Sequence, residues 1–238
     1  MTSKNSSNNA KHCFSIDSIS HLQDLIQSQK EILPFDLLGR SLSYNPYPPR
    51  FFEMFPMLCN LDFVKSLKIS AFSFADLAQI QAQNAKIIVL DIARDSKANP
   101  LKEGLECIGY LRHYTDSLII VRDCFIDSYQ ILQALVYGAD ALLFNHFCPK
   151  GLLKQNVDFA FHLGLASILE SKNLRDIKDG IFAKVSGFCL PSECFSELAS
   201  LIPKRKIICA DFDIVQNLAH NNVKNISRAD FVLQDFAL

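Results

Sequence analysis

Charged and polar side chains stand at the carboxyl ends of a series of short apolar runs in this sequence. The residues at these ends are Lys68, Asp91, Arg122 with Asp123, Asn145 with His146, Glu170, Cys189, Asp211, and Gln234 with Asp235. Two cations, Lys68 and Arg122, and two carboxylates, Glu170 and Asp211, follow alternating runs. Such a set in one place suits a small anionic substrate and proton transfer between carbon and oxygen centres.

Polar residues at strand ends also have a plainer explanation. Strand ends meet loops, and loops are polar whether or not they bind a ligand. For any single residue the two explanations are equally good. A polar residue at almost every run's end nevertheless favours a shared site.

The apolar runs have the length and the residue types of buried β-strands. They begin near residues 63, 86, 118, 141, 167, 184, 206 and 230, and helix-like segments separate them. Strands that alternate with helices form βαβ units and a parallel sheet. Eight units at a spacing of about 24 residues predict a (β/α)₈ TIM barrel over residues 61–238, with its reactive face at the carboxyl ends of the strands. A doubly wound open sheet is the alternative.

Two segments precede the predicted barrel. Residues 1–15 are rich in Ser, Asn and Lys and predict a flexible tail, and residues 16–60 predict an N-terminal helical extension. Within the extension, an apolar stripe over residues 16–33 predicts a helix. Residues 41–56 hold four prolines among aromatic residues, and we expect a packed connecting arm without regular structure.

The last helix of the predicted barrel is missing from the sequence. The last strand-like run is followed by only three residues. Uncovered apolar patches larger than a few hundred Å² are rare on soluble monomers. We therefore expect the helix over residues 16–33, or a second subunit in a homodimer, to cover the seam between the first and last strands.

Composition excludes several classes of protein. The chain has 238 residues, 49% of them hydrophobic, with 24 basic and 25 acidic side chains, which excludes disorder and argues against non-specific nucleic-acid binding. No 18-residue apolar run predicts a membrane span, and the polar N-terminus has no signal core. Eight cysteines without a CxxC pair are typical of reduced thiols in a cytoplasmic protein, and the scattered histidines predict no metal site.

Glycine is scarce, which excludes two classes of phosphate site. Only eight glycines occur, and neither GxGxxG nor GxxxxGK[ST] is present. The dinucleotide fingerprint and the P-loop are therefore excluded. Loops with so few glycines are also poorly suited to bind phosphate through backbone N–H groups.

Residues 126–143, IDSYQILQALVYGADALL, resemble the segment after the third strand of indole-3-glycerol-phosphate synthases, where the pattern is KDFIID-YQI-EA---GAD-ILL. Residues 32–50 resemble the N-terminal extension of some members, and the segments at 105–115, 161–171 and 201–214 fall in the expected order. The resemblance covers about residues 31–236 and also implies a (β/α)₈ barrel. It implies a lyase of tryptophan biosynthesis without a cofactor. Its small phosphorylated substrate is 1-(2-carboxyphenylamino)-1-deoxyribulose 5-phosphate, whose indole ring it closes with loss of CO₂ and water.

The resemblance also implies roles for individual residues. The general-acid lysine of the family falls on Arg122, and the fifth-strand proton-transfer glutamate falls on Glu170. The first-strand E-x-K falls on Ser66 and Lys68, so the glutamate is lost and the lysine is kept. The sixth-strand asparagine aligns near Cys189.

The last two strands depart further from the family pattern. The seventh-strand E-S-G becomes Asp211, Phe212 and Asp213, and the eighth-strand motif becomes Gln234, Asp235 and Phe236. Family members bind phosphate here with glycine N–H groups, so the added aspartates predict a weak phosphate site. Arg122 is a second loss, because the pKa of arginine exceeds about 12 and its guanidinium holds anions without acting as a general acid.

Two functions stay open at this point. The first is indole-3-glycerol-phosphate synthase activity with Glu170, Lys68, Arg122 and Asp211 as catalytic residues, and Asn145 and Cys189 as substrate-binding residues. The alternative is a catalytically degraded barrel that binds a small anion or a protein partner. Neither function involves nucleic acid or a membrane.

Overall fold

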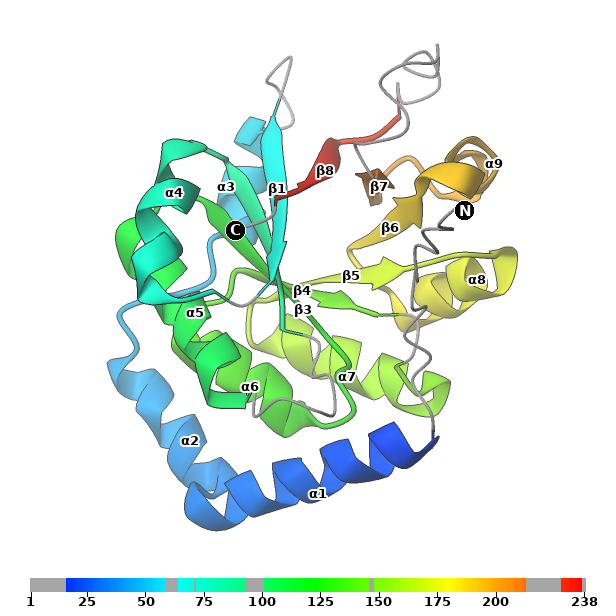
Figure 1. The fold of residues 1–238 in the computed structure, drawn as a ribbon. Helices are drawn as coiled ribbons and strands as arrows, with labels where there is room; N and C mark the ends of the chain where they lie inside the picture. The colour runs from blue at the N-terminus through cyan, green and yellow to red at the C-terminus, as the bar shows by residue number, and fades with distance from the viewer. Residues whose placement is uncertain are drawn as a thin grey trace, which may run out of the picture.

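Eight parallel strands form a closed barrel, in which each strand pairs with the next and β8 pairs with β1 (Figure 1). The computed structural model describes residues 16–58, 64–70, 72–92, 101–145, 148–212 and 228–236. The strands are β1 (Lys65–Ser70), β2 (Ile87–Asp91), β3 (Leu118–Asp123), β4 (Ala141–Phe144), β5 (Ala166–Glu170), β6 (Gly187–Pro191), β7 (Ile207–Phe212) and β8 (Phe231–Asp235). The (β/α)₈ prediction is confirmed, and the open-sheet alternative is wrong.

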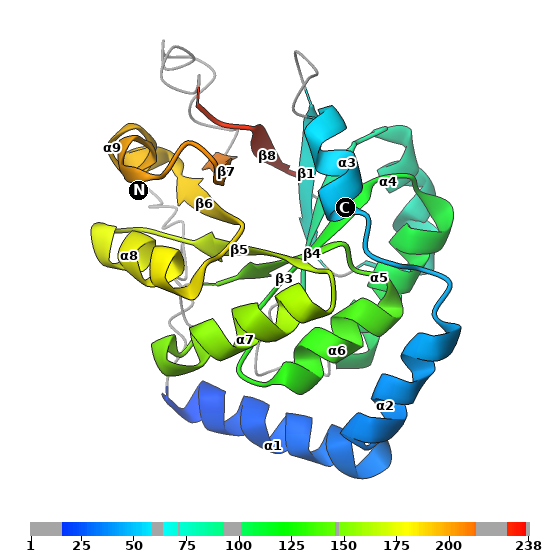
Figure 2. The same cartoon turned by 180° about the vertical axis from the view of Figure 1, so that it is seen from behind.

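Helices surround the barrel, as Figures 1 and 2 show from opposite sides. They are α4 (Leu77–Ala82), α5 (Leu101–Tyr114), α6 (Ser128–Tyr137), α7 (Lys150–His162), α8 (Leu174–Ala183) and α9 (Phe195–Leu201), with the 3₁₀ helices η2 (Phe74–Asp76) and η3 (Ser192–Cys194). The helix expected between β7 and β8 lies outside the described residues. Within the described part of the chain, no helix follows β8. No helix there is both long and apolar enough to cross a membrane.

Alternation along the strands separates two apolar cores. On β2, Ile87 and Val89 belong to the cluster inside the barrel, whereas Ile88 and Leu90 belong to the cluster between the barrel and its helices. Successive side chains of a strand point to opposite faces, so every second residue enters the lumen. The lumen is therefore a packed core, and only inward residues near the carboxyl ends of the strands reach the mouth of the barrel.

The N-terminal extension begins with α1 (Ile16–Ile32) and α2 (Phe35–Ser41). Leu22 and Ile26 of α1 are buried in one cluster with Tyr129 and Leu132 of α6. In both views α1 lies across α6 and α7, on the side of the molecule away from β8. The helix is confirmed, but the expectation that it covers the seam between β1 and β8 is wrong, because its apolar stripe packs on α6.

The proline-rich arm contains more regular structure than its composition predicts. It forms η1 (Leu42–Tyr44) and α3 (Phe51–Leu58), with Pro56 inside the helix. Phe51 and Leu58 are buried in the luminal cluster, and the Phe55 ring lies 6.1 Å from the Phe231 ring. The expectation of an irregular arm is wrong because burial of one apolar face stabilises even a short helix that contains proline. This helix closes the amino-terminal end of the barrel.

A buried ion-pair network attaches the arm to the barrel. Asp140, fully buried at the start of β4, accepts hydrogen bonds from the backbone N–H and the guanidinium of Arg50, at 2.8 and 2.9 Å. Arg112 on α5 donates to the same carboxylate at 2.7 Å, and the N–H of Ile119 on β3 at 2.9 Å. The network joins the extension, α5, β3 and the start of β4, and so fixes β3, the strand that carries Arg122.

Candidate active site

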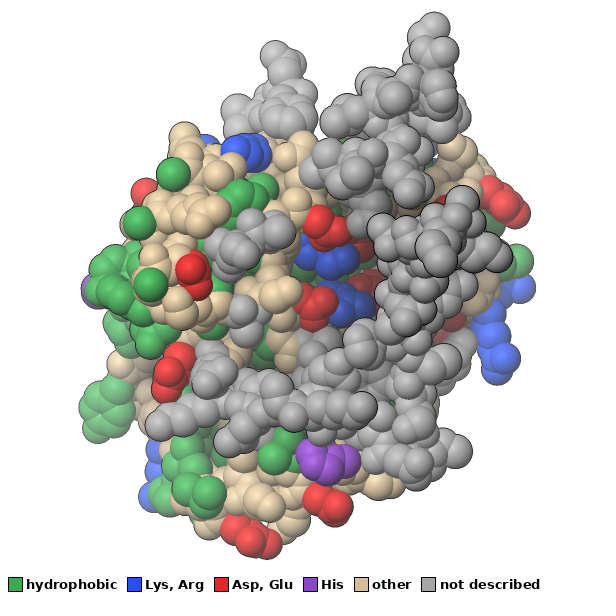
Figure 3. Space-filling view, viewed as in Figure 1, with side chains coloured by type: hydrophobic (Ala, Val, Ile, Leu, Met, Phe, Trp, Pro, Cys, Tyr) green, Lys and Arg blue, Asp and Glu red, His purple; other side chains and the backbone are tan. Residues whose placement is uncertain are grey.

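Six charged side chains meet at the carboxyl ends of the strands and form what we call the mouth cluster. They are Lys68 (β1), Asp91 (β2), Arg122 (β3), Glu170 (β5), Asp211 (β7) and Asp235 (β8). Figure 3 shows basic and acidic side chains side by side near the middle of one face of the molecule. Two cations and four carboxylates give the cluster a formal charge of −2. All four expected catalytic residues therefore lie in one place.

Arg122 bridges the carboxylates of two other strands. Its Nε and Nη2 donate to Glu170, the second bond at 3.1 Å, and its Nη1 donates to Asp91 Oδ2 at 2.7 Å. Burial disfavours the charged guanidinium, but Glu170 and Asp91 outweigh burial and raise the pKa of Arg122 above its usual value. The side chain is therefore permanently charged, and in this structure it holds two carboxylates of the protein itself.

Lys68 forms the second half of the cluster. Its Nζ donates to Asp211 Oδ2 at 2.9 Å and lies 3.9 Å from Asp235 Oδ1. Burial alone would lower the pKa of Lys68, but the two aspartates outweigh burial and raise it. Lys68 is thus an ammonium group with a proton to give, held by a carboxylate that makes the proton harder to release.

Cys189 and Asn145, the expected substrate-binding residues, occupy different positions. A cavity of about 120 Å³ is lined by Glu170, Ser171, Lys172, Cys189, Pro191 and Asp211. Cys189 lies in this cavity, and its Sγ is 3.7 Å from that of Cys209 on β7. Burial, with Cys189 adjacent, raises the pKa of Cys209 well above its usual value. Asn145 is buried just after β4 and does not line the cavity.

Strand alternation decides which polar residues at strand ends reach the mouth. Asp123 is fully buried on the outward face of β3, where its carboxylate accepts from Gln130 of α6 at 3.1 Å. Gln234 follows the luminal Leu233 and so also faces away from the lumen. His146 lies outside the described residues. The sequence analysis gave no catalytic or binding role to Asp91 or Asp235. Both lie an even number of residues after a luminal side chain of their strand, as Arg122 and Lys68 do, so they point inward. Strand alternation could therefore have identified them from the sequence.

The motif at residues 126–143 supports the site without taking part in it. Asp127 caps α6, and its side chain accepts from the N–H of Tyr129 at 2.8 Å. Gln130 accepts from the Ile126 N–H at 2.8 Å and donates to the Cys124 carbonyl at 2.9 Å. These bonds fix the loop that leaves β3 directly after Arg122. The most recognisable stretch of the sequence is therefore a framework for Arg122.

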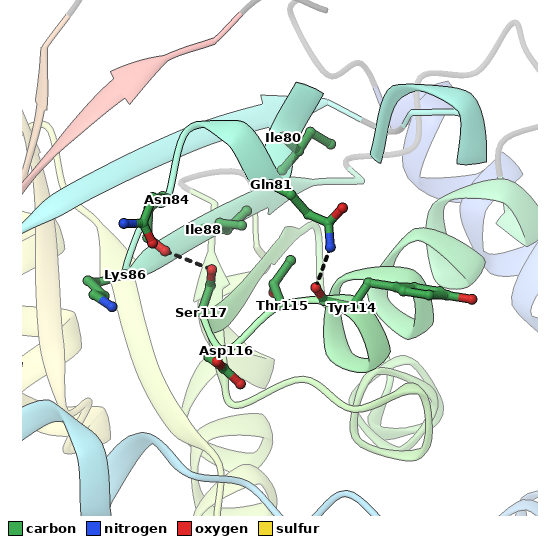
Figure 4. Close-up of a pocket in the computed structure, with 10 residues that line it drawn as sticks. Ile80, Gln81, Asn84, Lys86, Ile88, Tyr114, Thr115, Asp116 and Ser117 are labelled. Carbon is green, nitrogen blue, oxygen red and sulfur yellow. Dashed lines mark hydrogen bonds between the residues drawn. The ribbon is translucent and has the colours of Figure 1, made fainter. Parts of the chain in front are cut away.

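A second cavity lies at the opposite, amino-terminal end of the strands (Figure 4). Its volume is about 230 Å³, and its walls come from the α4–β2 and α5–β3 connections. Gln81 donates to the Tyr114 carbonyl at 2.7 Å and Ser117 to the Ala85 carbonyl at 2.8 Å, so these polar side chains tie the connections together. In TIM barrels this end of the strands serves stability.

The chain is similar in sequence to several known proteins that share one name. No protein-family model matches the chain. A Campylobacter hominis protein is 33% identical over 212 residues, which is 78% of this chain and 79% of the relative. A Campylobacter jejuni protein is 28% identical over 89% of each chain, and a Sulfurimonas denitrificans protein is 27% identical over 87% of this chain and 85% of the relative. All three are named indole-3-glycerol phosphate synthase.

Proposed function

Because this chain belongs to the indole-3-glycerol phosphate synthase family, we propose that it closes the indole ring of 1-(2-carboxyphenylamino)-1-deoxyribulose 5-phosphate, with loss of CO₂ and water, in tryptophan biosynthesis. One observation carries the proposal. Lys68, Arg122 and Glu170 converge at the carboxyl end of a closed barrel, which is where TIM-barrel enzymes hold their active sites.

In the proposed reaction the ring carbon that bears the carboxylate attacks the ketone carbon of the sugar chain. Arg122 holds the substrate carboxylate, and Lys68 protonates the ketone oxygen as the new carbon–carbon bond forms. CO₂ then leaves, and its bonding electrons return to the ring. Lys68 takes up a new proton from water and passes it to the new hydroxyl, which leaves as water, while Glu170 takes a proton from the carbon beside the nitrogen. Asp211 keeps Lys68 protonated and oriented.

We expect the reaction to be slow. Removing a positioned general acid costs about 10²–10⁴ in rate, and Arg122 cannot replace one. Lys68 gives up its proton against the attraction of Asp211 and Asp235. Asp235 also opposes binding of a phosphate dianion at the mouth, so the phosphate site is weak.

The setting of the protein is also part of the proposal. We place the protein in the cytoplasm and propose a homodimer in which the partner subunit covers the outer face of β8. The support for the dimer is that Val232 and Gln234, which face outward from β8, are only half-buried, whereas Leu67 and Ile69 on the neighbouring β1 are fully buried.

The test is to incubate the purified protein with the substrate and to measure the increase in indole fluorescence. Complementation of a tryptophan auxotroph is a second, independent assay. We expect turnover about 10²–10⁴ below that of family members with lysine at position 122. The control is Lys68→Met, which keeps the length of the side chain but has no proton to give. If the unmodified protein turns the substrate over no faster than Lys68→Met does, the proposed enzyme activity is rejected.

One observation favours a catalytically degraded barrel, in which the mouth no longer turns the substrate over. Every nitrogen of the Arg122 guanidinium already donates to a carboxylate of the protein, so the strongest anion-binding group of the mouth is occupied. In that case the Lys68→Met protein and the unmodified protein are equally inactive, and ligand binding is the only measurable property.

A further inference from the structure

Arg122 has two carboxylate partners that hold it with unequal strength. Glu170 accepts from two guanidinium nitrogens, and its side chain is 11% exposed. Of the guanidinium nitrogens, only Nη1 donates to Asp91, whose side chain is 25% exposed. Paired bonds to one carboxylate are stronger than a single bond, and exposure to water lowers the cost of breaking an ion pair. Asp91 is therefore the partner that a ligand can replace.

We propose that Asp91 is a specificity-determining residue, an internal carboxylate that occupies the Nη1 position on Arg122 and must move aside before a ligand carboxylate can bind there. The inference deepens the proposed function and rests on it for the identity of the site. A group that displaces a carboxylate from a guanidinium must itself be anionic and accept hydrogen bonds, as carboxylates and phosphates do, and the proposed substrate brings a carboxylate to this part of the mouth. The ligand class is thus an aryl or alkyl carboxylate.

The negative charge of the mouth cluster also opposes the binding of a carboxylate, as does the presence of Asp91 on Nη1. The cluster has a formal charge of −2 with Asp91 and would have −1 without its charge. An incoming carboxylate therefore meets both a filled hydrogen-bond position and a repulsive field. Removing the Asp91 charge relieves both, whereas removing the charge of another mouth aspartate relieves only the field.

This difference supplies a matched control. Asp235 is 3.9 Å from Lys68 Nζ, and no hydrogen bond or ion pair of the structure joins it to Arg122 among the described residues. Asp91→Asn and Asp235→Asn change the charge of the mouth cluster equally, but only the first releases Arg122. Asp91→Ser is a second variant, which lacks the amide oxygen that could still accept from Nη1.

The experiment is a fluorescence titration with 2-(methylamino)benzoate, an aryl carboxylate that lacks the sugar phosphate. We expect Asp91→Asn and Asp91→Ser to bind it about tenfold more tightly than the unmodified protein, the size of effect that one neighbouring charge has on another. Asp235→Asn should gain clearly less. In an Arg122→Met background, Asp91→Asn should gain nothing, because the position that it opens no longer exists.

Three results would overturn the proposal. These are an equal gain in Asp235→Asn, a gain that persists without Arg122, and no binding by any variant whose circular dichroism spectrum and thermal midpoint match those of the unmodified protein. The titration measures binding without phosphate or turnover. A failed ring-closure assay with a tenfold gain in binding would therefore reject the proposed enzyme and leave the role of Asp91 in place.

Discussion

At the scale of single residues, the chemistry of the mouth depends on whether position 122 can give up a proton. An Arg122→Lys variant restores an ionisable amine there, but one ammonium group cannot keep the bonds that the guanidinium makes to both Glu170 and Asp91. We expect no measurable recovery of ring closure from this change alone. Adding Phe212→Ser and Asp213→Gly restores the serine and glycine of the family's seventh-strand motif. The combined variant should exceed either part in kcat/KM, because binding energy from the phosphate holds the reacting end in place.

That expectation would be contradicted if Arg122→Lys alone reached the rate of family members with lysine, or if the unmodified protein already did. In either case the phosphate-binding end of the site would be intact. In the second case a neighbour of Arg122 would supply the acid. Both variants are compared at saturating and at limiting substrate, so that kcat and KM are separated.

The ion pairs of Lys68 should make the free energy of unfolding depend on pH at high pH. Its pKa in the folded protein is raised above the value of about 10.4 of an unfolded chain, with Asp211 and Asp235 as the cause. Its contribution to the free energy of unfolding is therefore complete below about pH 10.4 and is lost as the pH rises from there through the folded pKa. The difference in urea midpoint between the unmodified protein and Lys68→Met should be constant from pH 7 to 9 and should shift against the unmodified protein above about pH 10.4. A difference independent of pH would show that the ion pair has no part in it.

Most of the site is predictable from sequence at this scale, because inward and outward residues alternate along each strand. Lys68, Arg122, Glu170 and Asp211 needed only the end and the parity of each strand. The role of Asp91 could not be found this way, because the sequence does not show which carboxylate pairs with which cation across β2, β3 and β5.

At the scale of elements, the arm and the strands are joined at Asp140. The carboxylate is fully buried and accepts from Arg50, Arg112 and the Ile119 N–H. Asp140→Asn keeps the shape but leaves two arginines without their counter-charge, and breaking a buried pair in this way costs about 3–5 kcal/mol. Urea unfolding should show that loss. Asp116→Asn makes the same change at an exposed position and should stay within about 0.5 kcal/mol. A loss below about 1 kcal/mol at Asp140 would mean that the network does not hold the arm.

The positions of elements were harder to predict than their existence. The apolar stripe of α1 predicts a helix, but a stripe does not say which partner buries it, and α6 offers the buried Tyr129 and Leu132. Composition likewise misjudged α3, because three of the four prolines precede the helix and only Pro56 lies within it. In both segments long-range packing decided the outcome, and local pattern does not contain that information.

At the scale of the whole molecule, closure of the barrel followed from the number and spacing of the strand-like runs. A parallel sheet with both faces covered reads as continuous apolar runs, and Ile87 to Leu90 are all fully buried. Eight such runs joined by helices leave a closed barrel as the arrangement without exposed sheet edges. The resemblance over residues 126–143 pointed to the same fold, through residues that position the β3 end rather than through catalytic ones.

The outer face of β8 predicts how whole molecules associate. Val232 points outward there and is half-buried, packed against the edge of the outer core. Burying such apolar surface against a second subunit is favourable, at about 25 cal/mol for each Å² removed from water. Light scattering should therefore give a mass of twice the 26.8 kDa of one chain. Val232→Lys should shift the mass toward that of one chain, because a lysine ammonium group is costly to bury in an interface, and the circular dichroism spectrum should remain that of a folded barrel. A monodisperse monomer of the unmodified protein at micromolar concentration would contradict the dimer and leave β8 as a face that tolerates water.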